Sequence, residues 1–180
     1  MTVSGGNIIG TTGILSASSY SVTNTSGTSI ISAKLGGSGT LTKTGEGNLI
    51  LSGSNTNYSG VIKITGGVLA ATHNDALGNN ISGTSIAGGA TLDLQNVTIT
   101  SEVITLNGGT LKTSIGTSRL YGVVNLMASS IIDVSGDTNT SLTLFGGITE
   151  SDKSAKGIIK NGSGTLVLSK QGNNFYSSTG

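Results

Sequence analysis

The side chains in this sequence that could carry out acid–base or metal chemistry are few and widely spaced. The 180 residues include one histidine, His73, together with eight carboxylates and no cysteine. A catalytic triad needs a base beside a nucleophile and an orienting acid, and a zinc site needs several imidazole, thiolate or carboxylate ligands. With no cysteine and no second histidine to join it, His73 is interpreted as a residue of a polar turn. We therefore predict no metal site, no cofactor and no catalytic residue.

Carboxylates could instead serve a polysaccharide-cleaving enzyme, because glycosidases place two acids around the scissile bond. Here no Asp-x-Asp pair occurs, although one acid could stack on a charged residue from the neighbouring turn of the chain. The sequence therefore predicts that the protein is not an enzyme. The acids and the arginine that we expect on different turns are Asp93, Asp133, Asp137 and Arg119; the stacking partners considered for Asp93 are Glu102 and Lys112.

Short strands are the elements that must position these side chains. Apolar and polar residues alternate over short stretches bounded by Gly, Asn or Ser, which is the pattern of half-buried strands. No window shows a helical period, so we expect no helix beyond one turn near residues 75–77. The predicted strands are residues 40–42, 48–51, 61–64, 91–94, 103–106, 123–126, 131–134, 141–144 and 165–168.

Glycine pairs recur at a nearly fixed spacing. The pairs that share a turn-then-strand pattern begin at Gly66, Gly88, Gly108 and Gly146, so that the first two gaps are each close to one period and the last gap is close to two. A period of about 20 residues indicates a solenoid, whose units must stack because none can bury its own apolar face. The absence of proline fits continuous ladders between units. We predict an all-β, single-stranded right-handed parallel β-helix (β-solenoid) of about nine rungs, with residues 1–180 as a single segment.

The strand alternation also predicts which side chains point inward. Successive residues of a strand face opposite sides of the sheet. We expect the core to contain Leu92, Leu94, Ile104, Leu106, Ile132, Val134, Leu142 and Leu144, and we expect Asp93, Thr105, Asp133 and Thr143 to face water.

Charge and hydropathy exclude two classes of partner. The net charge is +1, aromatic residues are 3% of the chain, and the cationic residues are scattered, which does not suit nucleic acid binding. No apolar run is long enough to span a membrane as a helix, so we expect no membrane contact by this segment. The first residues lack the pattern of a signal peptide, and we expect any secretion signal to lie outside this sequence.

A longer motif recurs once and carries a family resemblance. Residues 43–52 (KTGEGNLILS) align with residues 160–169 (KNGSGTLVLS), about six rungs later at the expected period. The chain resembles the autotransporter-associated β-strand repeat found in passengers of type V secretion in Gram-negative bacteria. We place repeat copies at residues 38–60 and 155–180, the second incomplete. The first copy continues with NYSG at 57–60, GVL at 67–69 and ALG at 76–78.

The resemblance implies a function as well as a fold. It implies a passenger that is exported through the outer membrane and is extracellular or displayed on the bacterial surface, as part of a longer chain. Its role would be that of a structural or adhesive stalk or display scaffold, with host or cell-surface ligands as partners. Two alternatives stay open: an extracellular filament or matrix protein that self-associates end to end through exposed strand edges, and a polysaccharide-active β-helix enzyme.

Overall fold

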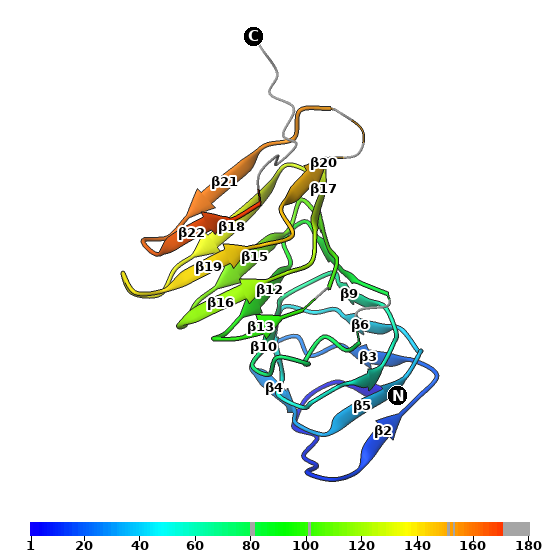
Figure 1. Cartoon of the computed structure of the whole chain (residues 1–180). Helices are drawn as coiled ribbons and strands as arrows, with labels where there is room; N and C mark the ends of the chain where they lie inside the picture. The colour runs from blue at the N-terminus through cyan, green and yellow to red at the C-terminus, as the bar shows by residue number, and fades with distance from the viewer. Residues whose placement is uncertain (80–81, 101, 151, 153, 171–180) are drawn as a thin grey trace.

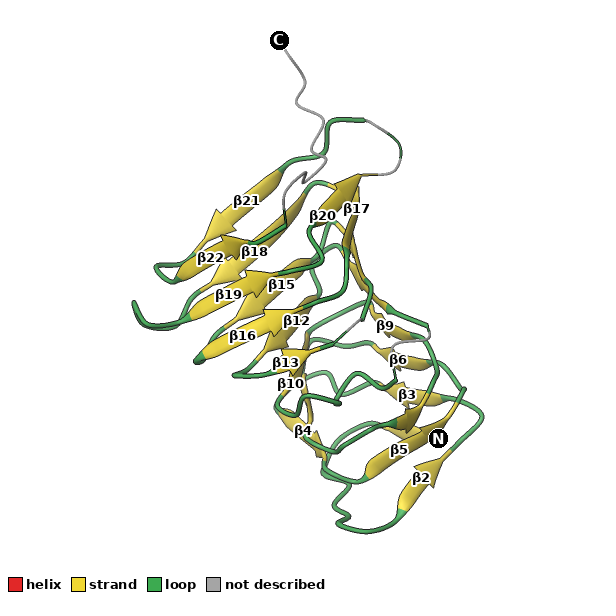
Figure 2. Ribbon diagram, in the orientation of Figure 1, coloured by secondary structure: helices red, strands yellow, loops and turns green. Residues whose placement is uncertain are grey.

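The computed structural model describes residues 1–180 except 80–81, 101, 151, 153 and 171–180. The described residues form 22 short strands and no helix (Figure 2). Every ladder that joins two of these strands is parallel. In the described part of the chain no helix has the length and apolarity that crossing a membrane requires. The predicted class, an all-β parallel solenoid, is confirmed.

Two long sheets run along the solenoid from one end to the other (Figure 1). Sheet A contains, in spatial order, β1 (Thr2–Val3), β3 (Tyr20–Val22), β6 (Leu41–Lys43), β9 (Ile62–Ile64), β11 (Thr84–Ala87), β14 (Ile104–Asn107), β17 (Val124–Ala128) and β20 (Ile148–Glu150). Sheet B contains β4 (Thr28–Ile31), β7 (Asn48–Leu51), β10 (Val68–Ala71), β12 (Thr91–Leu94), β15 (Thr110–Thr113), β18 (Ser130–Val134) and β21 (Ile158–Asn161). All nine predicted strands coincide with observed strands to within two residues.

The third face of the solenoid is divided between two sheets. Sheet C covers the N-terminal half with β2 (Ile14–Ser16), β5 (Lys34–Gly37) and β8 (Asn57–Tyr58). Sheet D covers the C-terminal half with β13 (Thr98–Ile99), β16 (Thr117–Leu120), β19 (Ser141–Leu144) and β22 (Thr165–Leu168). Between them lies the connection from β10 to β11, residues 72–83, of which no described residue belongs to a strand. The single turn expected near residues 75–77 lies in this connection.

One apolar core fills the space between the three faces. All eight side chains predicted to point inward are fully buried there. Three of the four predicted outward residues are partly exposed, as expected, but Asp93 is only 5% exposed. The expectation that Asp93 faces water is wrong because the side chains of Gln95 and Ser114 lie against its carboxylate.

The solenoid has about eight turns, and the prediction of about nine was too high because the rungs differ in length. Leu92 pairs with Leu111 in the next rung, whereas Ile131 pairs with Ile159 across a rung that is nearly half as long again. The glycine pairs are also less regular than their spacing suggested. The pairs at Gly66, Gly88 and Gly108 precede strands of sheet B, but the pair at Gly146 precedes β20 of sheet A.

Candidate functional site: the repeat corner and the charged outer column

The repeat motif turns the corner between β6 and β7, and Lys43 lies at its centre. Lys43 points inward and is fully buried. Its Nζ donates hydrogen bonds to the carbonyl oxygens of Thr44 (2.7 Å), Gly45 (2.8 Å) and Gly66 (3.3 Å). All three ammonium protons therefore find acceptors, two in its own rung and one in the next. Burial lowers the pKa of Lys43, an effect that the negative charge of Glu46 opposes.

The two glycines of the motif allow the corner to pack closely against the preceding rung. Gly45 has φ of 72°, and a Cβ there would lie 2.5 Å from the carbonyl oxygen of Asn24. A Cβ on Gly47 would lie 2.3 Å from Nδ2 of the same asparagine. The corner is thus in close contact with the preceding rung through its glycines and with the following rung through Lys43. This arrangement explains why a lysine and two glycines alternate in the motif.

The tyrosine of the repeat closes another corner from inside. Tyr58 is fully buried, its hydroxyl accepts the N–H of Leu41 (2.9 Å), and it lies within 3.0 Å of the carbonyl oxygens of Gly39 and Val61. Burial raises the pKa of Tyr58, which keeps the hydroxyl protonated as a donor. The ring of Tyr20 packs edge-on against it, with centroids 5.8 Å apart. The Tyr20 hydroxyl also lies among backbone groups, within 2.7 Å of the carbonyl oxygens of Leu15 and Gly36.

The second copy of the motif repeats these local contacts at a different corner. Nζ of Lys160 donates to the carbonyl oxygen of Gly162 (2.7 Å), as Lys43 does to that of Gly45. Lys160 pairs in register with the inward residue Ile132, but it lies in sheet B, whereas Lys43 lies in sheet A. The two copies are therefore separated by five rungs and one face, and the expectation of about six rungs is wrong because several rungs are longer than the expected period.

Lys43 belongs to the motif that was identified from the sequence, but it was not among the predicted core residues. The available signal was the alternation itself, since Lys43 is two positions from the inward Leu41. Lysine is rarely buried without a charged partner, and for that reason an inward position was not expected for this residue.

Charged side chains form a column on the outer face of sheet B. Asp93 pairs in register with Lys112, and Lys112 pairs with Asp133. Nζ of Lys112 contacts the Asp133 carboxylate (3.2 Å), while Asp93 accepts hydrogen bonds from Ser114 and Gln95. Of the two stacking partners considered for Asp93 from the sequence, Lys112 is therefore its neighbour in register and Glu102 is not.

The remaining sequence candidates are dispersed. His73 lies in the connection 72–83, where its Nδ1 accepts the N–H of Asp75 (3.1 Å). Arg119 is exposed on sheet D, and Asp137 caps the turn before β19 by accepting the N–H of Asn139 (3.0 Å). Among the described residues, no group of three or more histidine, cysteine or acidic side chains is arranged to hold a metal ion.

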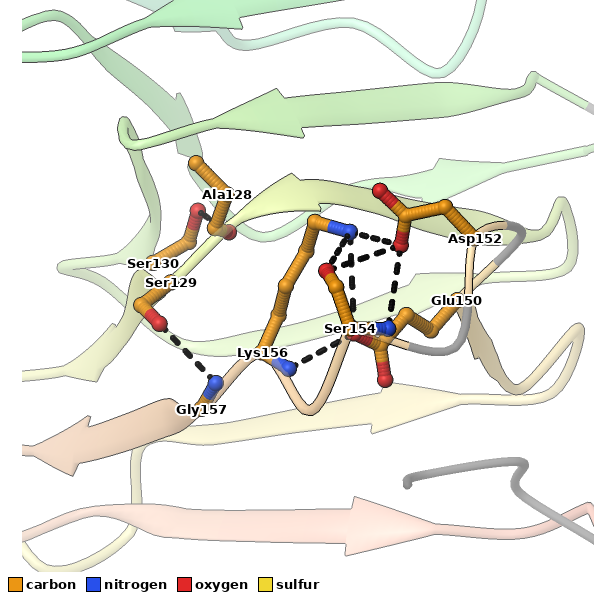
Figure 3. A network of polar contacts seen from close by, with 8 residues as sticks. All are labelled: Ala128, Ser129, Ser130, Glu150, Asp152, Ser154, Lys156 and Gly157. Carbon is orange, nitrogen blue, oxygen red and sulfur yellow. Dashed lines mark hydrogen bonds and ion pairs between the residues drawn. The ribbon is translucent and has the colours of Figure 1, made fainter. Parts of the chain in front are cut away.

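A polar network closes the long connection between β20 and β21 (Figure 3). The carboxylate of Glu150, which is fully buried, accepts the backbone N–H of Lys156 (2.6 Å). Nζ of Lys156 contacts Asp152, and this hydrogen bond lowers the pKa of Asp152. Gly157 donates its N–H to Ser129 Oγ in the preceding rung (3.0 Å). These contacts anchor the connection to the solenoid.

Glu102 is a buried acid that the sequence did not single out for its environment. It is 2% exposed just before β14, and its Oε1 accepts the hydroxyl of Thr84 (2.6 Å). Desolvation raises its pKa to about 7, although the Thr84 hydrogen bond opposes the shift. The folded protein therefore favours the neutral carboxylic acid at this position.

This burial predicts that stability falls as the pH rises. The unfolded chain ionises Glu102 near pH 4.5 and the folded chain near pH 7, so the stability that Glu102 contributes is fully present below pH 4.5 and is lost as the pH rises to about 7. Glu102→Gln removes the ionisation, and we expect it to raise the free energy of unfolding by about 2–3 kcal/mol at pH 8. At pH 4 it should change little. Urea unfolding at both pH values measures the change in the free energy of unfolding. Glu46→Gln, which replaces an exposed carboxylate, is the control. Equal effects of the two variants at pH 8 would contradict the prediction.

Comparison with known proteins identifies the motif. Residues 41–71 and 158–179 match the passenger-associated transport repeat family. Both copies of the lysine–glycine corner lie inside the matched residues. No solved structure matches the chain.

One curated relative extends the similarity beyond the repeat. The chain is 36% identical over 133 residues to the adhesin BmaC autotransporter of Brucella suis biovar 1 (strain 1330). The match covers 72% of this chain and 4% of the relative. The chain thus spans only a small part of the length of this relative.

Proposed function

Because the chain carries passenger-associated transport repeats of the autotransporter type, we propose that it is a segment of a passenger exported through the outer membrane. On the cell surface or after release, the segment acts as a stalk or display scaffold. Its contribution is mechanical: it holds other parts of a long chain away from the membrane and offers a long side surface for contacts. Host or cell-surface ligands are the partners that suit this role.

The observation that carries the proposal is the way the repeat is built into the stacking of rungs. Lys43 and the glycines after it connect three successive rungs through hydrogen bonds and close backbone contact. Sheet A continues through eight strands without interruption. A motif that reinforces stacking serves a scaffold, since each rung depends on its neighbours for a buried face.

The name of the relative supports an adhesive scaffold in preference to an enzyme. The outer column also gives the polysaccharide alternative no support. Lys112 lies between Asp93 and Asp133, and the Asp93 carboxylate already accepts three hydrogen bonds. A general acid and a general base must both face the substrate.

Surface display tests the proposal. The chain is placed between a secretion signal and an outer-membrane β-barrel, and intact cells are probed with an antibody against an epitope inserted at the exposed turn near Asp137. We expect the epitope to be accessible on intact cells and the chain to resist protease as a folded unit. A matched fusion to a barrel variant that cannot insert should give no surface signal. Retention of the chain in the periplasm beside a correctly inserted barrel would contradict the proposal.

Self-association is a second candidate, because unpaired parallel strand edges can pair with another copy. Sizing over a wide concentration range with electron microscopy distinguishes the two roles. Filaments that lengthen with concentration would favour self-association, and monodisperse particles at high concentration would exclude it.

A further inference from the structure

A groove crosses the outer face of sheet B along the solenoid axis. Its volume is about 320 Å³, and it extends from Thr28 on β4 to Lys112 on β15. Its apolar floor consists of Ile50, Val68 and Ala70. The groove forms because the small Ala70 lies in register between the longer side chains of Ile50 and Asp93.

One wall of the groove is formed by a buried carboxylate, that of Asp93, which makes only neutral hydrogen bonds among the described residues. Asp93 is 5% exposed and accepts hydrogen bonds from the Ser114 N–H (3.0 Å), the Ser114 hydroxyl (2.7 Å) and the Gln95 amide (2.8 Å). All three donors are neutral. Among the described residues no cation lies within ion-pair distance of Asp93, because Lys112 contacts Asp133. A buried charge of this kind is stabilised by an opposite charge brought in from outside.

The hydrogen bonds of Asp93 also define the shape of the cation. Oδ2 accepts two of them and Oδ1 accepts one. A carboxylate has about four acceptor positions, so only one on Oδ1 is left. A guanidinium binds best through two parallel bonds to both oxygens, which this geometry does not offer. A primary ammonium needs a single acceptor and suits the remaining position.

We propose that the groove binds a lysine side chain from a partner protein. The four methylenes of lysine lie along the floor of Ile50, Val68 and Ala70, and the ammonium contacts Oδ1 of Asp93. Lysine side chains commonly cover apolar surface with their stems while their charged ends reach a polar group. This inference rests on the adhesive part of the proposed function, because it gives the scaffold a binding surface of its own.

Titration of the chain with Nα-acetyl-lysine-N-methylamide, followed by methyl NMR, tests the proposal. We expect saturable shifts at Ile50, Val68 and Ala70, with at least tenfold weaker binding of the norleucine analogue, which lacks the ammonium. The arginine analogue should also bind more weakly than lysine. Non-saturating shifts, or equal binding of lysine and norleucine, would overturn the proposal. Tighter binding of spermidine than of a lysine-containing peptide would indicate a free polyamine and would also overturn it.

Two variants locate the site. Asp93→Asn keeps the side-chain shape and should weaken lysine binding at least tenfold, whereas Asp137→Asn, at an exposed acid that does not line the groove, should not. Ala70→Leu fills the floor and should abolish the shifts while the aspartate at position 93 is kept. It therefore decides the matter if Asp93→Asn fails to fold. Unchanged binding in Ala70→Leu would place the lysine elsewhere. Display on cells is measured separately, so a negative titration leaves the scaffold function standing.

Discussion

Gly122→Ala is expected to destabilise the solenoid by about 3–5 kcal/mol, close to the upper limit for a single substitution. Gly122 lies at the corner between sheets D and A, where a Cβ would be 1.7 Å from the carbonyl oxygen of Glu102. That atom belongs to the backbone of the preceding rung and cannot rotate away. The next rung repeats the close approach, since a Cβ on Gly146 would lie 2.1 Å from the Gly122 carbonyl oxygen. The corner therefore cannot relax in either direction.

Urea unfolding followed by circular dichroism measures the effect. Gly13→Ala is the matched control, because a Cβ at Gly13 meets nothing within 4 Å. Its effect should stay within about 0.5 kcal/mol, the usual range for a surface substitution. A Gly122→Ala midpoint within error of the Gly13→Ala midpoint would show that the corner is looser than the structure has it.

Lys43→Ala is expected to lower the free energy of unfolding by about 3 kcal/mol. The substitution removes the Lys43 donor from three partly buried carbonyl oxygens and opens a cavity in the core. The same change at Lys160 should cost well under about 1 kcal/mol, because that side chain is exposed and donates one hydrogen bond.

The comparison of the two lysines is informative because each begins a copy of the same motif, and the two copies are identical at six of ten positions. Lys43→Met adds a second test: methionine refills much of the volume, so the stability that it does not recover reports the hydrogen bonds. We expect Lys43→Met to restore about 1 kcal/mol relative to alanine. Similar losses at Lys43 and Lys160 in urea unfolding would mean that bridging between rungs contributes little.

Much of this fold could be predicted from the sequence, because strand alternation and solenoid stacking are local and repetitive. Leu92 and Leu94 are inward because they alternate with Asp93, and no long-range information is needed to see it. The number of rungs was harder to predict from the sequence. It depends on the lengths of connections such as the one between β10 and β11, which have no period of their own. The pair beginning at Gly146 fits the period of the other pairs although it turns a different corner.

The environment of the polar residues was predicted less well, because it depends on which rungs come into register. Asp93 and Lys112 belong to different rungs, and only the pairing of β12 with β15 shows them to be neighbours. Ser114 and Gln95 bury Asp93 through side-chain hydrogen bonds that no spacing rule encodes. Glu102 lies where sheet C ends and sheet D begins, and the alternation pattern gives no sign of that change.

The central claim is that this chain folds as a parallel solenoid after export, and cysteine pairing on the cell surface tests it most directly. The natural sequence has no cysteine, so introduced pairs report without interference. Thr42 and Lys63 are register partners on adjacent strands of sheet A, whereas Ser85 lies one strand further. Partners on adjacent parallel strands are within the Cα separation of about 4.4–6.8 Å that a disulfide requires.

Intact cells displaying the chain on a β-barrel are treated with an oxidant after export, and the passenger is examined on non-reducing gels. We predict that the pair Thr42→Cys and Lys63→Cys forms an intramolecular disulfide in nearly all displayed molecules. The pair Thr42→Cys and Ser85→Cys should stay reduced. Equal cross-linking of the two pairs, or none in either, would show that the displayed chain is not a parallel solenoid in this register.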